Sequence, residues 1–265
     1  MEIGFIGGGT MAEALISALL KGKVVSPSEV LVGEPVAARR RELSERYHVQ
    51  VTADNKKAAD AEIVVLAVKP NRFAAVAAEL KGKLTPQQTV VSIMAGVTLA
   101  RLREGLQHEA LVRVMPNTPS QVGEGMSAWT ATSAVAETTR EQVRRVLQAV
   151  GKEAYFEEER FIDMATAVCG SGPGFVFLLM EAFIDGAVHI GLPRQTATEM
   201  VIQTFFGSAQ LARQTGRLPS ELRALVTTPG GTTAEGLLAL ENAGVRAAIM
   251  ESLIAAFEKS KALGG

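Results

Sequence analysis

Near the start of the chain, the fold is decided by the run Ile3-Gly4-Phe5-Ile6-Gly7-Gly8-Gly9-Thr10-Met11-Ala12. Its first four residues have the apolar character of a short buried strand, and Met11–Leu20 has the spacing of a helix. The glycines between them follow the pattern G-x-G-x-x-A. Such a pattern between a strand and a helix is typical of dinucleotide-binding folds.

Each small residue of this loop has an expected role. Gly7 permits the tight turn, Gly9 lets the backbone approach a pyrophosphate, and Ala12 lets the helix pack closely on the strand. The first N–H groups of the helix have no partner within it, so they suit phosphate oxygens. The alternative is a glycine-rich turn without a ligand, which the strand and helix on either side make the weaker interpretation.

Strands and helices alternate over the first 155 or so residues, which predicts βαβ units and a parallel sheet. After Glu157-Glu158-Glu159 the strand-like runs end and the pattern is helical. We therefore expect a Rossmann-type α/β domain over residues 1–160 and an all-α domain over residues 161–265. The expected strands are Ile3–Ile6, Val30–Val32, Ile63–Val68, Val90–Ile93 and Leu111–Met115, and the expected helices of this part include Val36–Arg46.

The helices of the second half are unusually apolar. Between Arg194 and Arg213 the only charged residue is Glu199, and a helix that is apolar nearly all round must be buried on most sides. We expect a second copy of the chain to cover part of this surface. The alternative is a helix at the centre of a monomeric bundle.

Composition excludes several classes of function. The formal net charge is -1, so the chain has no excess of positive charge to bind a phosphate backbone. Aromatic residues make up only 5%, so few side chains can stack on bases, and no nucleic acid is expected. One cysteine, Cys169, cannot form an internal disulfide, which fits a reducing compartment. We interpret Cys169 as a small buried residue rather than as a nucleophile. No Cys/His cluster has the spacing of metal ligands, so no metal is expected.

The chain is expected to be cytoplasmic and free of membrane spans. The apolar N-terminus lacks a basic flank and is interrupted by Glu13, unlike a signal peptide. The uncharged stretch Met164–Met180 contains Gly170-Ser171-Gly172-Pro173-Gly174, which we expect to break it in the middle.

The choice between NADH and NADPH stays open at the end of the second strand. Glu34 suits the two ribose hydroxyls of NADH, whereas a neighbouring arginine suits the 2′-phosphate of NADPH. Arg39, Arg40 and Arg41 follow at once, although a solvated helix face explains them equally well.

Three further segments follow expected strands, at the edge where open α/β sheets bind ligands. They are Ala67-Val68-Lys69-Pro70, Met94-Ala95-Gly96 and Met115-Pro116-Asn117-Thr118-Pro119. We expect them to line the nicotinamide end of the site, although Lys69 also fits a plain surface lysine.

In the second half, small and hydroxyl residues precede an apolar helix over Val226–Leu237. Thr232 or Thr233 is expected to cap this helix, whose free N–H groups suit a carboxylate. An ordinary capped helix is the plainer interpretation of this segment taken alone.

Taken together, these segments resemble the pyrroline-5-carboxylate reductase family over nearly the whole chain. The resemblance rests on Gly7-Gly8-Gly9, Ala67-Val68-Lys69-Pro70, Met115-Pro116-Asn117-Thr118-Pro119, Gly170-Ser171-Gly172-Pro173, Gly191-Leu192-Pro193-Arg194 and the specific segment Val226–Leu237. It implies reduction of the C=N bond of 1-pyrroline-5-carboxylate to L-proline with NADPH or NADH. It also implies an intertwined dimer, assembly of dimers up to a pentamer of dimers, and a substrate site shared across the dimer interface.

The resemblance also assigns site residues. Thr233 matches the threonine that hydrogen-bonds the ring nitrogen, and Glu34 replaces a small polar residue that is frequent in the family, which weakens the expectation of NADPH. The substrate set is Asn117, Thr228, Gly231, Thr232 and the catalytic Thr233. The cofactor set is Ile6, Gly7, Gly8, Gly9, Thr10, Met11, Glu34, Asn55, Ala67, Val68, Lys69, Pro70, Ala95 and Gly96.

Two rival functions are weighed against this one. The β-hydroxyacid dehydrogenases also join a Rossmann domain to helices, but they use a helical lysine, and no lysine lies between Lys152 and Lys259. A non-catalytic dinucleotide sensor has no need of the expected carboxylate pocket around Thr233.

Overall fold

A computed structural model describes residues 1–264 of the chain and divides it into two compact units. Unit 1 holds Met1–Ser171 together with the stretch from Ala255 onward, and unit 2 holds Gly172–Ile254. The α/β architecture of the first part and the helical character of the second are as predicted.

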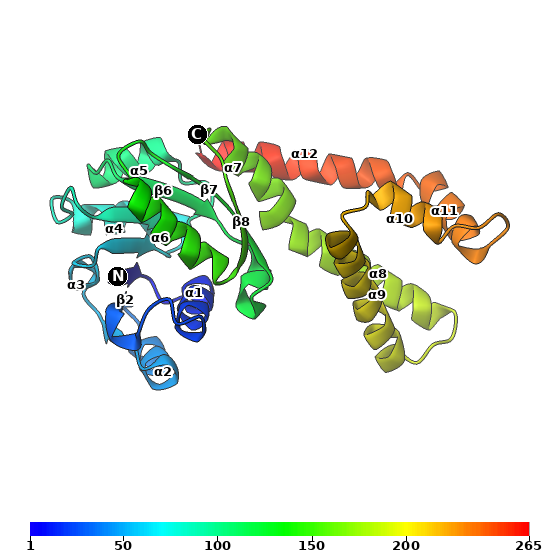
Figure 1. Cartoon of the computed structure of the whole chain (residues 1–265), viewed down its shortest axis with the longest axis horizontal. Coiled ribbons are helices and arrows are strands. Elements are labelled where there is room, and N and C mark those ends of the chain that lie inside the picture. The colour runs from blue at the N-terminus through cyan, green and yellow to red at the C-terminus, as the bar shows by residue number, and fades with distance from the viewer. Residues whose placement is uncertain (265) are drawn as a thin grey trace. The chain divides into compact units, whose positions relative to one another are not determined.

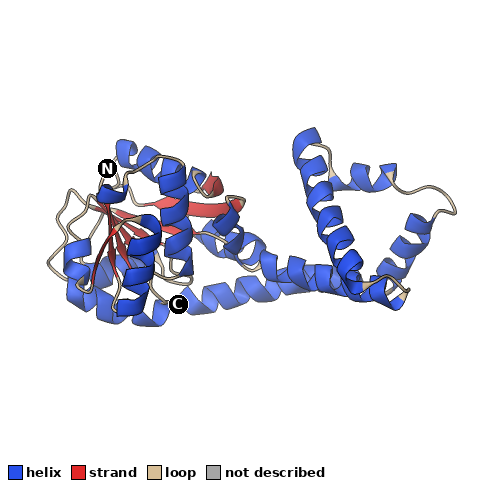
Figure 2. Cartoon of the chain, turned by 90° about the horizontal axis from the view of Figure 1, so that it is seen from below, coloured by secondary structure: helices blue, strands red, loops and turns tan. Residues whose placement is uncertain are grey.

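Unit 1 is built on an eight-stranded sheet with the order β3-β2-β1-β4-β5-β6-β7-β8 (Figures 1 and 2). Strands β3 to β6 in this order are parallel to one another, with Ile3 of β1 opposite both Val30 and Ile63. Strand β7 runs antiparallel to β6, and β8 is parallel to β7. The strands are β1 (Ile3–Ile6), β2 (Val30–Gly33), β3 (Gln50–Thr52), β4 (Ile63–Leu66), β5 (Thr89–Ser92), β6 (Leu111–Met115), β7 (Gly125–Ala131) and β8 (Gly151–Tyr155).

Helices cover both faces of this sheet, because alternate side chains of a strand point to opposite faces. Ile3 and Phe5 of β1 join one apolar cluster, while Ile6 joins the other. Helices α1 (Thr10–Lys21), α2 (Ala37–Tyr47) and α6 (Glu137–Gln148) contribute to the first cluster. Helices α3 (Asn55–Ala58), α4 (Phe73–Leu80) and α5 (Leu99–Leu106) contribute to the second. Both faces are buried, which explains the continuous apolar run of β4 and the burial of every residue of β5.

All five predicted strands are present in a mostly parallel sheet, as predicted, and the sheet contains three further strands. Strands β3, β7 and β8 were not expected, and β7 reverses the direction. The connection from β6 to β7 holds only a short 3-10 turn, Thr118–Val122, and a parallel crossover needs a longer segment. The small residues of β7, such as Gly125 and Ser127, give it little of the β-branched character that marks a strand.

The expected break at Gly170–Gly174 is also wrong. Helix α7 (Arg160–Ala165) continues through a π-helical turn, Thr166–Gly170, and α8 (Gly172–His189) follows. Pro173 is the second residue of α8, where its missing N–H removes no helical hydrogen bond. The run Arg160–His189 is long and apolar enough to cross a membrane by length and composition, contrary to expectation. One such helix is weak evidence, since a helix covered by other protein meets the same criterion.

Unit 2 consists of helices that bury almost nothing within their own chain. Along α8, α9 (Arg194–Thr215), α10 (Pro219–Leu225) and α11 (Thr232–Asn242), Ala197 and Val201 of α9 are the buried residues among those described. Large apolar side chains are exposed instead, including Phe177 at 59%, Leu178 at 63% and Phe206 at 54%. A helix at the centre of a monomeric bundle would be covered, so the structure favours a second copy as the cover. The last helix is α12 (Val245–Gly264).

Candidate cofactor and substrate sites

The glycine loop joins β1 to α1 at the carboxyl edge of the sheet. Gly7 has φ +100°, a conformation that favours glycine, and its N–H donates to the Gly33 carbonyl at 2.7 Å. A Cβ on Gly7 would lie 2.8 Å from the Ala67 carbonyl oxygen. Ala12 is buried at the base of α1, as expected for close packing of helix on strand. The tight turn and the close packing are therefore confirmed.

Gly9 is different, because a Cβ built on it would meet no atom within 4 Å. The protein fold alone therefore does not require glycine at this position. Gly9 is the N-cap residue of α1, and no side chain caps the helix there. The exposed first-turn amides of Thr10 and Met11 consequently face a space that the chain leaves clear, which is what an approaching phosphate group requires.

A pocket of about 560 Å³ lies beside this loop. It brings together seven of the predicted cofactor residues: Gly7, Gly9, Glu34, Asn55, Ala67, Val68 and Lys69. These residues come from the ends of β1, β2 and β4 and from α3, so the topology collects them at one edge. A dinucleotide fits this set of groups, with cationic side chains and helix amides for phosphates and a carboxylate for ribose hydroxyls.

The pocket also contains residues that sequence reasoning missed. Arg72, Ala75, Val76 and Glu79 line its far wall, along the turn after Pro70 and helix α4. Their spacing of three to four residues places them on one helical face, but the sequence carries no signal that this face lines a pocket. Arg72 places a second cation near Lys69, and both side chains are exposed to solvent.

Glu34 is held in place by two backbone amides. Its carboxylate accepts hydrogen bonds from the Gly8 N–H and the Val36 N–H, each at 2.9 Å. A fixed carboxylate at the end of β2 lies where the adenosine ribose of a dinucleotide binds in this fold.

Two of the three arginines after Glu34 form hydrogen bonds or ion pairs within the chain. Arg39 donates to the Gly8 carbonyl at 2.7 Å and pairs with Glu13 and Glu42. Arg40 donates to the carbonyl oxygens of Glu34 and Pro35. The interpretation of Arg39–Arg41 as a purely solvated helix face is therefore wrong for the first two, whose guanidinium groups brace the glycine loop and the β2 turn.

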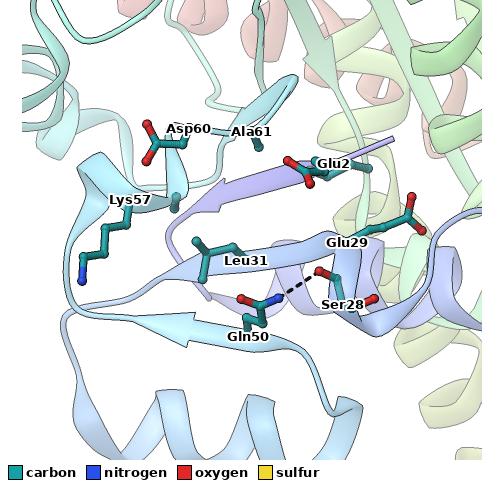
Figure 3. Close-up of a pocket in the computed structure, with 10 residues that line it drawn as sticks. Glu2, Ser28, Glu29, Leu31, Gln50, Lys57, Asp60 and Ala61 are labelled. Carbon is teal, nitrogen blue, oxygen red and sulfur yellow. Dashed lines mark hydrogen bonds between the residues drawn. The ribbon is translucent and has the colours of Figure 1, made fainter.

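A second pocket lies at the opposite edge of the sheet, where β1, β2 and β4 begin (Figure 3). Glu2, Ser28, Asp60 and Ala61 line it, and Gln50 donates to the Ser28 carbonyl at 2.9 Å across it. Its volume of about 130 Å³ is small for a dinucleotide. The carboxyl edge is thus the better candidate for the cofactor.

Other predicted cofactor residues lie around the pocket rather than in its lining. Ile6 is fully buried in β1, and Gly8 is buried with its N–H bound to Glu34. Pro70 opens the turn that contains Arg72, and Ala95-Gly96 follows β5 at the same carboxyl edge. Their contacts with a cofactor stay predictions.

Asn117 bridges two parts of unit 1. Its side-chain amide donates to the Cys169 carbonyl at 3.0 Å and accepts from the Met126 N–H at 2.8 Å. These bonds fix the turn between β6 and β7 against the π-helical segment. They use its side-chain oxygen and one amide hydrogen, so one hydrogen remains available to a substrate. Burial raises the pKa of the Cys169 thiol, which disfavours a nucleophilic thiolate.

In unit 2, the segment before α11 forms a tight turn. The Gly231 N–H donates to the Thr228 carbonyl at 3.0 Å, and Gly230 has φ +68°. The prediction that Thr232 or Thr233 caps the helix is wrong, because the N-cap is Gly231 and no side chain bonds there. A Cβ on Gly231 would lie 2.5 Å from the Thr228 hydroxyl oxygen, so that hydroxyl lies beside the helix start. The amides of Thr232 and Thr233 open the helix without an intrahelical acceptor.

Family models match both the N-terminal and the C-terminal part of the chain. The family described as pyrroline-5-carboxylate reductase dimerisation matches residues 159–263, and that described as NADP oxidoreductase coenzyme F420-dependent matches residues 2–96. A pyrroline-5-carboxylate reductase of Synechocystis is 42% identical over 265 residues, covering 100% of this chain and 98% of the relative. One of Escherichia coli is 36% identical, covering 99% and 98%.

Solved structures agree along the whole chain. A pyrroline-5-carboxylate reductase of Coxiella burnetii has a TM-score of 0.93 at 34% identity and covers 100% of this chain and 98% of that one. The pyrroline carboxylate reductase of Plasmodium falciparum, solved with NADP bound, has a TM-score of 0.91 at 30% identity, with the same coverage.

A Rossmann-type sheet with an open phosphate cradle, followed by dimerisation helices, defines an NAD(P)H-dependent oxidoreductase that associates with copies of itself. Within that class the match extends over the full chain at well above 30% identity. The chain belongs to the pyrroline-5-carboxylate reductase family, and the resemblance predicted from sequence is confirmed.

Proposed function

We propose that this chain reduces the C=N bond of 1-pyrroline-5-carboxylate to L-proline, the last step of proline biosynthesis. The full-length match to reductases of this name carries the proposal. When bound, the dinucleotide supplies the hydride. The chain's own residues must hold it, hold the small anionic imine beside it, and favour the protonated ring nitrogen.

The cofactor residues divide this work by position. The amides at the start of α1 and the side chains of Lys69 and Arg72 offset the charge of the pyrophosphate. Asn55 and Glu34 face the adenosine end, and Ala95-Gly96 faces the nicotinamide end, following the strand order of the fold. The remaining predicted residues, Ile6, Gly8, Thr10, Met11, Val68 and Pro70, shape the backbone between these points.

We infer a preference for NADH. The Glu34 carboxylate is anchored by two amides, and Arg39 is paired with two glutamates, so a 2′-phosphate would meet a fixed negative charge and no free cation from Arg39. Two ribose hydroxyls can instead donate to Glu34.

The turn before α11 provides the substrate groups. The amides of Thr232 and Thr233, with Gly231 and the Thr228 hydroxyl, hold the substrate carboxylate at the helix start. The Thr233 hydroxyl orients the ring nitrogen by a hydrogen bond. A threonine is a weak acid, so solvent supplies the proton and Thr233 acts by orientation. Asn117 offers its remaining amide hydrogen to the substrate.

We propose the domain roles and the assembly of the chain from the same family resemblance. Residues 1–160 bind the cofactor, and residues 161–265 dimerise and complete the substrate site with the partner copy. The exposed apolar side chains of α8 and α9 support this dimer, and dimers would assemble further into a pentamer of dimers. We propose a cytoplasmic protein without membrane, metal or nucleic-acid partners, with the apolar run Arg160–His189 covered by a second chain.

The test is steady-state kinetics on 1-pyrroline-5-carboxylate with NADH and NADPH. Thr233→Ala should lower turnover by about tenfold or more, the loss expected for one oriented hydrogen bond to the reacting group. Thr232→Ala is the matched control, because the proposed role of Thr232 uses its backbone. Turnover that is unchanged in Thr233→Ala removes Thr233 from the mechanism. Binding of NADH without its oxidation would favour the sensor.

A further inference from the structure

The last turn of α12 belongs to unit 1 and lies against the loop that follows β5. At Gly96, a built Cβ would lie 2.7 Å from the Leu263 Cβ and 3.4 Å from its carbonyl oxygen. One residue further, a Cβ on Gly264 would lie 3.1 Å from Thr98 Cγ2. The C-terminal turn is thus in direct contact with both ends of the segment Gly96–Thr98.

Gly96 is confined by two independent constraints. It has φ +71°, which favours glycine, and Leu263 leaves no room for a side chain. Gly96 is also buried, although it lies at the carboxyl edge of the sheet. The residues beside it are fixed in turn, since the Met94 N–H donates to the Ser92 hydroxyl at 3.3 Å within the core.

A partly buried ionic cluster around the buried Arg113 anchors the C-terminal turn. Arg113 of β6 is 2% exposed and pairs with Asp163 at 2.7 Å and with Glu159 at 2.9 Å. Ser260, which is 4% exposed, donates its hydroxyl hydrogen to the same Asp163 oxygen at 2.9 Å. Glu159 also accepts the Leu99 N–H at 2.7 Å, at the start of the helix that follows Gly96.

We propose that Ser260 and Leu263 are positioning residues for the cofactor: the C-terminal turn is the back wall that fixes Ala95-Gly96 against the nicotinamide. This inference rests on the proposed placement of Ala95-Gly96 at the nicotinamide end. Hydride transfer depends on the position of the reacting carbon to within about 1 Å, so a wall that sets this loop controls turnover without touching substrate.

The test compares two ligands. NADH carries the nicotinamide, whereas ADP-ribose carries the adenosine and pyrophosphate without it. Their dissociation constants are measured for the full-length protein, for Ser260→Ala, for Leu263→Gly and for a chain ending at Lys259. Lys261→Ala is the matched control, because its exposed side chain in the same turn pairs with Glu258 and lies over the Phe257 ring, both on α12 itself.

The NADH dissociation constant is expected to rise about threefold or more in the three variants, with kcat falling alongside, while ADP-ribose binding stays constant. Ser260→Thr, which keeps the hydroxyl, should restore the wild-type values. Equal weakening of both ligands would indicate general damage to unit 1 and overturn the inference, as would unchanged binding of both. If the wild type failed to reduce 1-pyrroline-5-carboxylate, the reaction would be wrong, yet the comparison of ligands would still decide the role of the turn.

Discussion

Replacing Glu34 with serine removes the fixed carboxylate at the ribose end of the pocket. A 2′-phosphate carries nearly two negative charges, and about 5 Å from one carboxylate in a water-like medium its repulsion costs about 1.5 kcal/mol. Loss of a charge-assisted bond to the ribose costs NADH about 1.5 kcal/mol. The two effects add to about 3 kcal/mol in the ratio of kcat/KM for the two cofactors, or about a hundredfold toward NADPH.

The assay is the decrease of NAD(P)H absorbance with saturating 1-pyrroline-5-carboxylate at fixed ionic strength, since salt screens the repulsion. Glu45→Ser is the control, because it makes the same change of charge on the exposed face of α2, outside the pocket. A thermal melt of each variant separates specificity from stability, as Glu34 also binds the Gly8 and Val36 amides. A ratio that moves by less than about threefold refutes the assignment of Glu34 to the ribose.

Three further predictions concern stability. Arg113→Met leaves Glu159 and Asp163 without their cation, so the free energy of unfolding in urea should fall by about 3 kcal/mol, and a fall below about 1 would contradict the ionic cluster. Gly7→Ala forces a side chain into a positive-φ position beside the Ala67 carbonyl, which should cost about 2 kcal/mol in the same assay, whereas an unchanged midpoint would argue against this turn geometry. The hydrogen bond from the N-terminal ammonium lowers the pKa of Glu29 from 4.5 to about 2, so its stabilisation is present above pH 4.5 and is lost as pH falls toward 2. Thermal melts from pH 7 to 2 should therefore decline less steeply over that window in Glu29→Gln, and parallel curves for the two proteins would refute the pairing.

Local signals were sufficient for much of unit 1. The five predicted strands were short, mostly apolar runs, as a sheet buried on both faces requires. Strands β3 and β8 escaped notice because their residues are mixed in polarity and sit at the sheet edges. The break predicted at Gly170–Gly174 was wrong. Proline and glycine interrupt most helices, but here Pro173 lies in the first turn of α8, after a π-helical segment.

In the candidate site, too, some residues could be predicted from the sequence and others could not. Gly7, Gly9 and Glu34, which line the pocket, could be predicted because a glycine at a strand end and an acid at the next strand end have roles set by the backbone. Arg72 and Glu79 were missed because only the packing of α4 on the sheet turns their helical face into the pocket. The contacts of Arg39 with Gly8 and Glu13 could not be predicted either, since these residues are 31 and 26 positions away in the sequence.

The sequence by itself determined five of the strands with their alternating helices, the glycine loop after the first strand and the apolar surplus of the second half, because each depends on neighbours within about ten residues. The tertiary structure alone decided which way β7 runs, which cations are free to meet a ligand, and that the last turn of α12 lies behind Gly96. Those facts depend on contacts between residues far apart in the chain, such as Ser260 with Asp163. The periodicity of the sequence does not predict these contacts, because they form only when the packed core brings distant segments together.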